Sequence, residues 1–391
     1  MQYRIPAVFM RGGTSRAVCF REDALAPYDQ ATRERIILAA LGSPDPYGRQ
    51  IDGLGGGISS LSKVAIIGRS TEAHSDVTFT FGQVDVYRPF IDWRGTCGNI
   101  SAAVGPFAID EGLVPAVAPV TPVRVLATNT GKRYIAYVPV QDGMAAVEGD
   151  YTIDGVPAPG ARITLEYLEP GGSLGGPVLP TGTPRQEVTL ADGRRVTISL
   201  VDVAVPVVYV RAAELGADAT RLAPELDADR SLQETLEALR CHAALLLGLA
   251  QSLEEAHTRV QAIPKIAMVA PPAAYVSSSG RPITAEQVDL VARAISMGNT
   301  HRTFPGTVSM CTAAAAAIPG TVVQEVAHPA RPGLLRIGHP AGVMEVGARV
   351  QQRHGAWHVE SVTTQRTARR IMEGYVLVPR RYLEGKPWFE G

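Results

Sequence analysis

A cysteine lies where a loop changes into an apolar segment of small residues, and this position favours reactivity. Cys97 is followed by Gly98 and Asn99 and then by the stretch 100–107, which predicts a helix. The backbone N–H groups at the start of a helix stabilise an anion, so a thiol at this point can have its pKa lowered from about 8.5. Glycine lets the backbone approach a ligand closely, and unpaired N–H groups can hold a carboxylate. The segment therefore predicts a reactive thiol beside an anion-binding site.

A lysine stands at the entrance of an apolar strand. The glycine- and serine-rich stretch 50–62 leads into Lys63, and the apolar run 64–67 follows it. Desolvation disfavours the charged form of lysine, which lowers its pKa and makes a neutral amine available as a base. A lysine at a strand end with its ammonium group in water is the simpler interpretation, and the residues alone favour it. The buried lysine with a lowered pKa is the alternative.

A polar loop follows the opening strand, which we expect within 1–10. The segment 11–16 carries two glycines, which expose backbone N–H groups, and Thr14 and Ser15, which add hydroxyl donors. This combination suits a carboxylate or a phosphate. The GK[ST] ending of a phosphate-binding P-loop is missing, and a simple turn between two strands explains the segment equally well.

Three short segments of the second half could offer donors to a second carboxylate. The segments 263–265, 298–301 and 338–342 each place a lysine or a histidine beside proline or glycine. A histidine in such a turn is more often a structural residue. The substrate contacts that we expect from this half are Lys265, Ser279, Met297 and His301.

Composition defines the class of protein but not its chemistry. The chain has 391 residues, a formal net charge of −1 and 46% hydrophobic residues, which predicts two or three globular domains. Near-neutral charge without a basic run argues against nucleic acid or a membrane surface as partners. The first residues lack the pattern of a signal peptide, and no stretch reaches the roughly 18 apolar residues of a membrane span. We therefore expect a soluble protein.

The cysteines and histidines are scattered. Cys19, Cys97, Cys241 and Cys311 form no pair at metal-ligand spacing, and the histidines form no HxH or HxxxH pair. Neither a zinc site nor a disulfide framework is indicated. A reducing, cytoplasmic setting fits best, and we expect no metal.

Strand signals outnumber long helices along the chain. Alternating apolar and polar residues predict half-buried strands at 77–81, 83–87, 133–140 and 195–200. Turn signals follow at 129–131, 142–143 and 192–193, and the 39 glycines and 29 prolines suit many short strands. Helices are predicted at 31–41, from 97 onward, at 231–261 and at 285–296.

The two halves show a rough internal symmetry. Each half holds one small-residue helix, the first beginning near Cys97 and the second running through the alanines 313–317. Strands can surround such a helix closely, so we expect an α/β protein of two similar β-rich domains with a cleft between them. The glycine- and proline-rich segment 171–183 is the expected connector. The predicted domains are 1–183 and 184–391, with a C-terminal strand near 375–383 that could return to the first.

Several segments make a resemblance specific. The segments 10–15, 42–45, 50–56, 60–63 and 97–107, together with the late Gly-His-Pro-x-Gly at 338–342, resemble the PrpF family. This family includes 2-methylaconitate cis-trans isomerases, methylitaconate delta-isomerases and 4-oxalomesaconate tautomerases. The resemblance runs in order along essentially the whole chain.

The resemblance implies the fold of diaminopimelate epimerase and a mechanism without a cofactor. That fold has two pseudo-symmetric, β-barrel-like α/β domains, each wrapped around a central helix, with the active site in the cleft between them. In the family, the residues matching Lys63 and Cys97 are the proton-transfer pair, and the loop matching 11–15 helps to bind a substrate carboxylate. Lys63 thereby changes from a structural residue to an expected catalyst.

The expected reaction follows from the chemistry of such substrates. The chain should move or invert a C=C bond in a small unsaturated di- or tricarboxylate, with Lys63 as base and Cys97 as acid. Removal of the proton builds negative charge along a dienolate, which the backbone N–H groups and hydroxyls of the loop 12–15 and of residues 98–99 should stabilise. The remaining expected substrate contacts in the first half are Arg11, Gly12, Gly13, Thr14, Ser15, Gln50, Ser60, Ser62, Thr96, Gly98 and Asn99. The only partners we expect are this substrate and further copies of the chain, in a homodimer or homotetramer.

Two residues depart from the family pattern, and they bear on the choice of substrate. Thr96 stands before the cysteine where the family usually has asparagine, and Ala341 stands where the family often has serine. Both positions are expected to touch the substrate, so the reaction type is better defined than the substrate.

Other interpretations remain. Cys97 and Cys311 could be the two thiols of a racemase or epimerase, but Cys311 is followed by Thr312 and alanines, not by the glycines of a second anion site. The general burial of free cysteine favours a structural role for it. A cysteine nucleophile for acyl transfer would need histidine and asparagine partners, and none is evident. A non-catalytic carboxylate-binding protein would have no use for Lys63 or Cys97.

Overall fold

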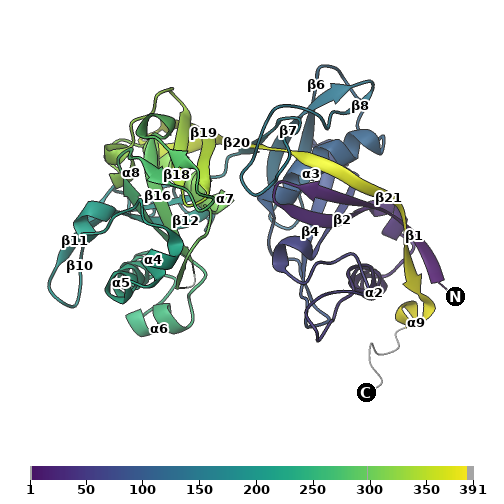
Figure 1. The fold of residues 1–391 in the computed structure, drawn as a ribbon, viewed down its shortest axis with the longest axis horizontal. Coiled ribbons are helices and arrows are strands. Elements are labelled where there is room, and N and C mark those ends of the chain that lie inside the picture. Colours follow the sequence, from purple (N-terminus) through teal and green to yellow (C-terminus); the bar gives the residue numbers. More distant parts are fainter. Residues whose placement is uncertain (1, 297, 385–391) are drawn as a thin grey trace. The chain divides into compact units, whose positions relative to one another are not determined.

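The chain folds into two compact units (Figure 1). A computed structural model describes residues 2–296 and 298–384. The first unit contains Met1–Tyr167 and Gln365–Gly391, and the second contains Leu168–Thr364. The C-terminal strand belongs to the first unit because it pairs with the first strand along its length.

The segment 171–183, expected to connect the domains, lies within the second unit. The Gly172 N–H donates to the carbonyl of Asp202 (2.9 Å), and the Asp202 N–H donates to the carbonyl of Val178 (2.8 Å). These bonds attach the segment to a strand of the second unit. The first unit therefore ends at Tyr167, before the expected boundary at residue 183.

The first unit is a sheet of eight main strands that pair in the order β21–β1–β2–β3–β4–β6–β7–β9. The β2–β3 and β4–β6 pairs are parallel and the others are antiparallel. The strands are β1 (Gln2–Gly12), β2 (Ser15–Arg21), β3 (Lys63–Arg69), β4 (Val77–Val84), β6 (Val120–Ala127), β7 (Lys132–Gln141), β9 (Ile163–Leu168) and β21 (Ala368–Pro379), with short β5 (Ile91–Asp92) and β8 (Met144–Ala145).

A small-residue helix forms the centre of this unit. Helix α3 (Gly98–Asp110) contacts β1, β2, β3, β6, β7 and β21, and its residues 100–109 are all buried. Small side chains are needed at these contacts: a Cβ added to Gly105 would lie 2.6 Å from Val138 of β7. The strands therefore wrap around α3, as Figure 1 shows, and hold its first residue, which follows Cys97, in a fixed place.

The opposite face of the strands is covered by a second helix. Helix α2 (Gln30–Leu41) begins after Asp29, whose carboxylate accepts from the Thr32 N–H, and ends at Gly42 in the left-handed conformation. Its apolar residues, Ile36 and Ile37 among them, pack in a second core that includes residues of β1, β2 and β3. The short helices of this unit are α1 (Glu22–Leu25), η1 (Ser59–Leu61) and α9 (Arg380–Leu383).

The second unit repeats the strand pattern of the first. Its strands pair in the order β10–β11–β12–β13–β16–β18–β19–β20, with parallel pairs again at the third and fifth positions. The strands are β10 (Gln186–Thr189), β11 (Arg195–Val203), β12 (Val205–Arg211), β13 (Lys265–Ala270), β16 (Leu290–Ser296), β18 (Leu334–His339), β19 (Gly342–Arg353) and β20 (Ala356–Arg366), with short β14 (Tyr275–Val276), β15 (Pro282–Ile283) and β17 (Asn299–Thr300). By this order β13 corresponds to β3.

The central helix of the second unit is α7 (Gly306–Ala316), which contacts β11, β12, β18 and β19. Most of its side chains are buried, as in α3. The expected symmetry of two small-residue helices, each surrounded by strands, is thus present. The other helices are η2 (Ala212–Leu215), α4 (Ala223–Asp227), α5 (Arg230–Leu246), α6 (Leu253–Thr258), η3 (Ala285–Gln287) and α8 (Val322–Val326).

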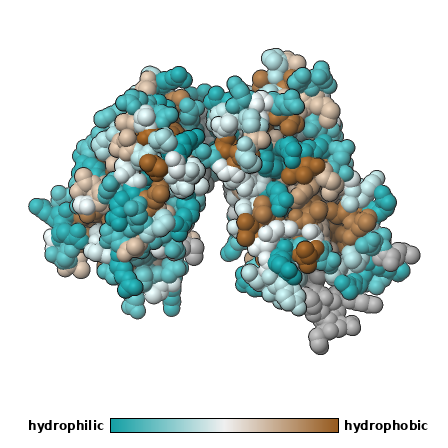
Figure 2. Space-filling view, viewed as in Figure 1, coloured by the Kyte–Doolittle hydropathy of each residue, from teal (hydrophilic) through white to brown (hydrophobic). Residues whose placement is uncertain are grey.

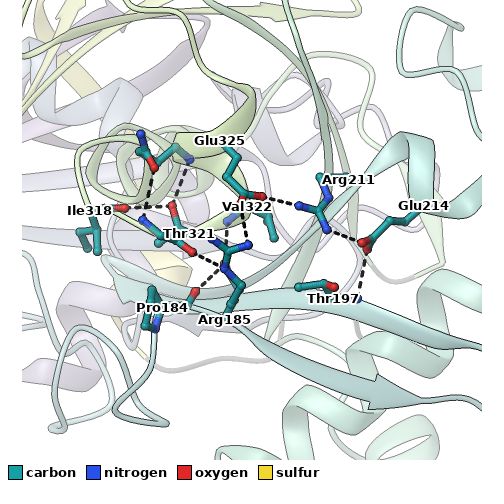
Figure 3. A network of polar contacts seen from close by, with 12 residues as sticks. Pro184, Arg185, Thr197, Arg211, Glu214, Ile318, Thr321, Val322 and Glu325 are labelled. Carbon is teal, nitrogen blue, oxygen red and sulfur yellow. Dashed lines mark hydrogen bonds and ion pairs between the residues drawn. The ribbon is translucent and has the colours of Figure 1, made fainter.

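A polar network ties α8 to the strands of the second unit (Figure 3). Glu325 accepts from Arg211 and forms an ion pair with Arg185 (2.5 Å), and Arg211 also pairs with Glu214. Glu214 in turn accepts from the Thr197 N–H (3.1 Å). These side chains are partly exposed, so each pair contributes at most about 1 kcal/mol, and the network orients the elements more than it stabilises them.

Three predicted elements were wrong in extent or type. The predicted helix 231–261 is two helices, since Gly248 adopts a left-handed conformation after α5 and Ser252 caps α6. The predicted helix 285–296 is one short turn, η3, followed by strand β16, which pairs with β13 and β18 and whose residues 290–295 are all buried, Arg293 included. The predicted strand 83–87 ends at Val84, because the Asp85 carboxylate accepts two backbone N–H groups and forms a turn.

Apolar side chains are exposed on the loops of the first unit. Ile51 is 78% exposed and Ile58 is 56% exposed, and both flank the glycines that precede Lys63. In the view of Figure 2, apolar side chains are interspersed with polar ones on the surface of each unit. Within residues 2–296 and 298–384, no helix combines the length and the apolar character needed to cross a membrane.

Candidate functional site

Lys63 is held at the start of β3 in a largely buried position. It is 7% exposed and lies directly opposite Gln83 in the antiparallel β3–β4 pair. Its Nζ donates to Gln83 Oε1 and lies 5.2 Å from the centre of the Phe81 ring. Burial lowers the pKa of Lys63 below its usual value, and the coulombic influence of nearby Cys97 opposes this shift. Of the two interpretations of Lys63, the structure shows the buried lysine and not the one with its ammonium group in water.

Gln83 is a site residue that the sequence analysis missed. Its Nε2 donates to the carbonyls of Ser59 (3.1 Å) and Ser62 (2.9 Å), which leaves Oε1 to face Lys63. The alternating pattern at 83–87 predicted a strand here. The missing information was its pairing with the strand after Lys63, which sets Gln83 opposite the lysine.

Cys97 is the residue immediately before α3, as the sequence predicted. Its thiol is partly exposed and packs against the core of the first unit. Its carbonyl accepts from both the N–H (2.9 Å) and the hydroxyl (3.0 Å) of Ser101, which fixes the first turn. The N–H groups of Gly98 and Asn99 are in the first turn of the helix, where no intrahelical acceptor exists. The thiol and these donors can therefore face the same anion.

Two tyrosines line the region of the thiol. Tyr134 donates to the carbonyl of Ser101 (3.2 Å), and its ring centre is 5.5 Å from that of Tyr167. A Cβ added to Gly98 would lie 3.4 Å from the Tyr167 hydroxyl. Burial raises the pKa of Tyr134 well above its usual value, so this phenol stays neutral. No local signal indicated these residues, since β7 and β9 reach the start of α3 only in the folded unit.

The polar loop 11–15 packs directly on the start of α3. Asn99 Nδ2 donates to the hydroxyl of Thr14 (3.0 Å), which is exposed. A Cβ added to Gly12 would lie 2.5 Å from the Asn99 carbonyl, and one added to Gly13 would lie 2.2 Å from Asn99 Oδ1. The two glycines thus allow Asn99 to approach the loop. The sequence predicts instead that these glycines expose N–H groups to a ligand.

Donors of this loop are partly used within the protein. The Gly13 N–H donates to the carbonyl of Thr367 (2.9 Å), and Arg11 Nη1 donates to the carbonyls of Gly13 (2.9 Å) and Thr367 (3.0 Å). Burial, together with the nearby Arg369, lowers the pKa of Arg11. Ser15 is buried. Among these residues, Thr14 is the one exposed to solvent, next to Asn99.

The glycine-rich loop before Lys63 is organised by Gln50. Gln50 is buried, its Nε2 donates to the hydroxyls of Ser43 (2.7 Å) and Ser62 (2.8 Å), and its Oε1 accepts from the Gly57 N–H (3.0 Å). These bonds satisfy the amide group, so Gln50 and Ser62 shape the loop. Ser60 lies partly exposed in η1, and Thr96 is exposed just before the thiol.

In the second unit, Lys265 and His301 lie near each other. Lys265 begins β13 as Lys63 begins β3. Burial lowers the pKa of both Lys265 and His301, and the charge of Lys265 lowers the pKa of His301 further. His301 Nδ1 accepts from the Thr303 N–H (3.2 Å), so the neutral ring carries its proton on Nε2. Ser279 is exposed, with its hydroxyl 3.0 Å from that of Ser277.

The remaining expected contact, Met297, lies outside the described residues. Whether Lys265, Ser279 and His301 contact the same substrate as Lys63 stays a prediction.

Cys311 has the environment of a structural residue. It is fully buried within α7, its Sγ donates to the Val201 carbonyl (3.3 Å), and burial raises its pKa to about 12. Cys97 is the residue immediately before α3, and the residue immediately before α7 is Pro305. The second unit therefore has no thiol at the start of its central helix among the described residues.

One group of side chains has metal-ligand chemistry, but an arginine already occupies it. Ligand atoms of Glu237, Cys241 and His257 lie within 4.8 Å of one another. Arg240 forms an ion pair with Glu237 (2.7 Å) and lies 3.3 Å from Cys241 Sγ. Burial raises the pKa of Cys241 to about 11, which keeps the thiol neutral. The guanidinium therefore takes the place that a cation would need.

The fold and the site together define a class of protein. The two repeated units around central helices are the diaminopimelate epimerase-like fold. A hydroxyproline epimerase from Agrobacterium vitis, solved with bound trans-4-hydroxy-L-proline, shares this fold with a TM-score of 0.50 at 13% identity, over 96% of this chain and 94% of the epimerase.

The chain belongs to the PrpF protein family, whose model matches residues 2–379. It is 43% identical to a 3-methylitaconate isomerase of Eubacterium barkeri, over 98% of this chain and 99% of that protein. It is 41% identical to a 2-methyl-aconitate isomerase of Shewanella oneidensis, over 97% and 98% of the two chains. The crystal structure of a methylitaconate-delta-isomerase matches with a TM-score of 0.92 at 42% identity, over 100% and 99%. The protein is an isomerase.

Proposed function

We propose that the protein isomerises a small unsaturated di- or tricarboxylate by proton transfer between Lys63 and Cys97. The observation that carries this proposal is that both side chains adjoin one core: the Lys63 amine lies 5.2 Å from the centre of the Phe81 ring, and Cys97, immediately before α3, packs against the core to which Phe81 belongs. A buried amine with a lowered pKa is suited to accept a proton, and a neighbouring thiol is suited to return one.

The proposed reaction begins with the neutral amine of Lys63. Nζ removes a proton from an allylic carbon of the substrate, and the C–H electron pair moves into the conjugated system, where it forms a dienolate. The N–H groups of Gly98 and Asn99 stabilise the negative charge. The Cys97 thiol then donates its proton to the far carbon of the system, and the C=C bond shifts. Return of the proton to the original carbon after bond rotation would give cis-trans isomerisation instead.

The proton balance of the cycle is closed within the pair. After one turnover Lys63 is an ammonium and Cys97 is a thiolate, and one proton must pass from the amine to the thiol before the next cycle in the same direction. The mutual electrostatic influence of the two groups suits this exchange. No redox change and no further reactant is involved.

The substrate is proposed as a class, for which the relatives supply the candidates. A 3-methylitaconate isomerase and a 2-methyl-aconitate isomerase are more than 40% identical to this chain. We therefore propose a methyl-branched unsaturated di- or tricarboxylate. Thr96 is exposed beside the thiol and is the residue that we propose adjusts this choice.

Proton NMR in deuterium oxide tests the proposal directly. The purified protein is incubated with 2-methylaconitate, methylitaconate, 4-oxalomesaconate and aconitate in turn. The expected result is a double-bond shift or a cis-trans inversion, accompanied by exchange of an allylic proton, in one methyl-branched substrate. Turnover of none of the four, or a shift without exchange from solvent over many turnovers, contradicts the proposal.

A further inference from the structure

The Gln83 side chain links the amine of Lys63 to the backbone that precedes it. Gln83 Nε2 donates to the carbonyls of Ser59 and Ser62, while Gln83 Oε1 accepts from Lys63 Nζ. The two donor bonds fix the orientation of the amide, because Nε2 is the only atom of the group that can donate. The Val84 N–H also donates to the Ser62 carbonyl (3.1 Å), which anchors the same loop to β4.

The β3–β4 register makes this arrangement rigid. Lys63 and Gln83 are cross-strand partners, and Phe81, two residues earlier on β4, places its ring 5.2 Å from the amine. Side chains at such positions lie on the same face of the sheet. The lysine is therefore confined by a ring on one side and an amide oxygen on another.

An amide oxygen is the acceptor that suits a group which must change its charge. It can accept from an ammonium and from a neutral amine and adds no net charge of its own, whereas a carboxylate would pair with the ammonium and stabilise it much more strongly. We propose that Gln83 is the positioning residue of the isomerase: it anchors the Lys63 amine to the loop 59–62 and accepts from it in both protonation states. This inference rests on the proposed role of Lys63.

Few charged groups of the described residues act on Lys63, so a new charge at position 83 can change the pKa of its amine. Cys97, at the start of α3, is the one titratable group in the described residues whose charge acts on Lys63. On β2, Cys19 is fully buried and burial raises its pKa to about 12, so it stays neutral. The neighbours contributed by β4 are Phe81 and Gln83, which carry no charge. A carboxylate at position 83 would be the first negative charge opposite the amine on β4.

The test compares two substitutions of Gln83 with a matched control. Gln83→Glu adds a carboxylate, Gln83→Met removes the acceptor at similar volume, and Gln141→Glu adds the same charge at an exposed position of β7. The readouts are the pH dependence of kcat/KM and the NMR titration of Lys63 in protein labelled with [13Cε]lysine, assigned with Lys63→Met. The titration does not depend on turnover.

With Gln83→Glu, we expect the Lys63 titration and the acidic limb of kcat/KM to move together to higher pH, by about 1 to 3 units. With Gln83→Met, we expect kcat to fall by about 10- to 100-fold with little change in KM, because the amine loses the acceptor that orients it. Gln141→Glu should match the wild type in both readouts. Wild-type titration and pH profile in Gln83→Glu, in a folded protein, overturn the inference.

The two proposals can fail separately. If Lys63→Met retains turnover, the proposed base is wrong, whatever the Gln83 variants do. If Lys63→Met is inactive while both Gln83 variants keep the wild-type titration and kcat, the base stands and the positioning role of Gln83 is refuted.

Discussion

The amine of Lys63 and the thiol of Cys97 adjoin the same core, although one residue begins a strand and the other precedes a helix: Nζ lies 5.2 Å from the centre of the Phe81 ring, and Cys97 packs against the core that contains Phe81. β3 brings the first of these groups to the sheet that surrounds α3, and α3 carries the second at its start. Because both elements belong to the first unit, the geometry of the pair is set by the core of that unit alone.

Removal of either group should stop turnover, but at different steps. We expect Lys63→Met to lower kcat by about 10²- to 10⁴-fold and to abolish exchange of the allylic proton with deuterium oxide, since the base is gone. Cys97→Ser should lower the double-bond shift similarly but keep the exchange. Lys132→Met, at the exposed start of β7, is the matched control and should be fully active. Exchange lost in Cys97→Ser and retained in Lys63→Met would reverse the two roles.

The same lysine should weaken the fold. Because burial lowers the pKa of Lys63, the unfolded chain binds its proton more readily between the folded pKa and the usual 10.5. The cost is therefore full below the folded pKa and disappears as the pH rises toward 10.5. We expect Lys63→Met to raise the free energy of unfolding at pH 7 by about 1 kcal/mol, a gain that shrinks at alkaline pH. Urea unfolding at several pH values measures it, and equal or lower stability at pH 7 contradicts the expectation.

The contact of Gly13 with Asn99 should not tolerate a side chain. Gly13 has φ +50°, and an added Cβ would lie 2.2 Å from Asn99 Oδ1. We expect Gly13→Ala to cost about 2 to 3 kcal/mol of stability and to raise KM, because it displaces the start of α3. Gly131→Ala is the control: it has φ +66° with open space around it, so only the backbone strain of about 1 kcal/mol applies. Similar losses in both variants would show that the Asn99 contact is unimportant.

Cys311 should be dispensable for the chemistry. Its buried thiol, with a pKa raised to about 12, is a poor acid or base. We expect Cys311→Ala to retain kcat and KM while losing about 1 to 2 kcal/mol of stability from the small cavity. Steady-state kinetics at a temperature well below unfolding checks this. A loss of turnover without a loss of folded protein would restore the two-thiol interpretation.

Local sequence was enough to predict the parts of the site that depend on one segment. The position of Cys97 before a small-residue helix, and the entry of Lys63 into an apolar strand, both follow from adjacent residues. The resemblance to the PrpF family supplied the pairing of these two residues, which no local pattern contains. The Gly13 N–H, Arg11 Nη1 and Gln50 Nε2 already donate to Thr367, Ser43 and Ser62, which no local pattern indicated, and the substrate contacts assigned to these residues stay predictions.

What could not be predicted depends on strand pairing. Gln83 faces Lys63 only through the β3–β4 register, and Tyr134 reaches the start of α3 only because β7 wraps around it. The helix predicted at 285–296 failed for a related reason: residues 290–295 of β16 are all buried, so the strand lacks the alternation of apolar and polar residues that separates a strand from a helix.

The two units repeat one strand order but differ immediately before their central helices, where Cys97 precedes α3 and Pro305 precedes α7. This difference has a chemical consequence. An amine and a thiol are unlike partners, so the proposed mechanism gives the resting enzyme two forms of equal net charge, amine with thiol and ammonium with thiolate. In that mechanism, each form would be competent for one direction of the reaction. Substrate and product would therefore each select their own form of the enzyme, and the interconversion of the two forms would become a measurable step at high concentrations of both.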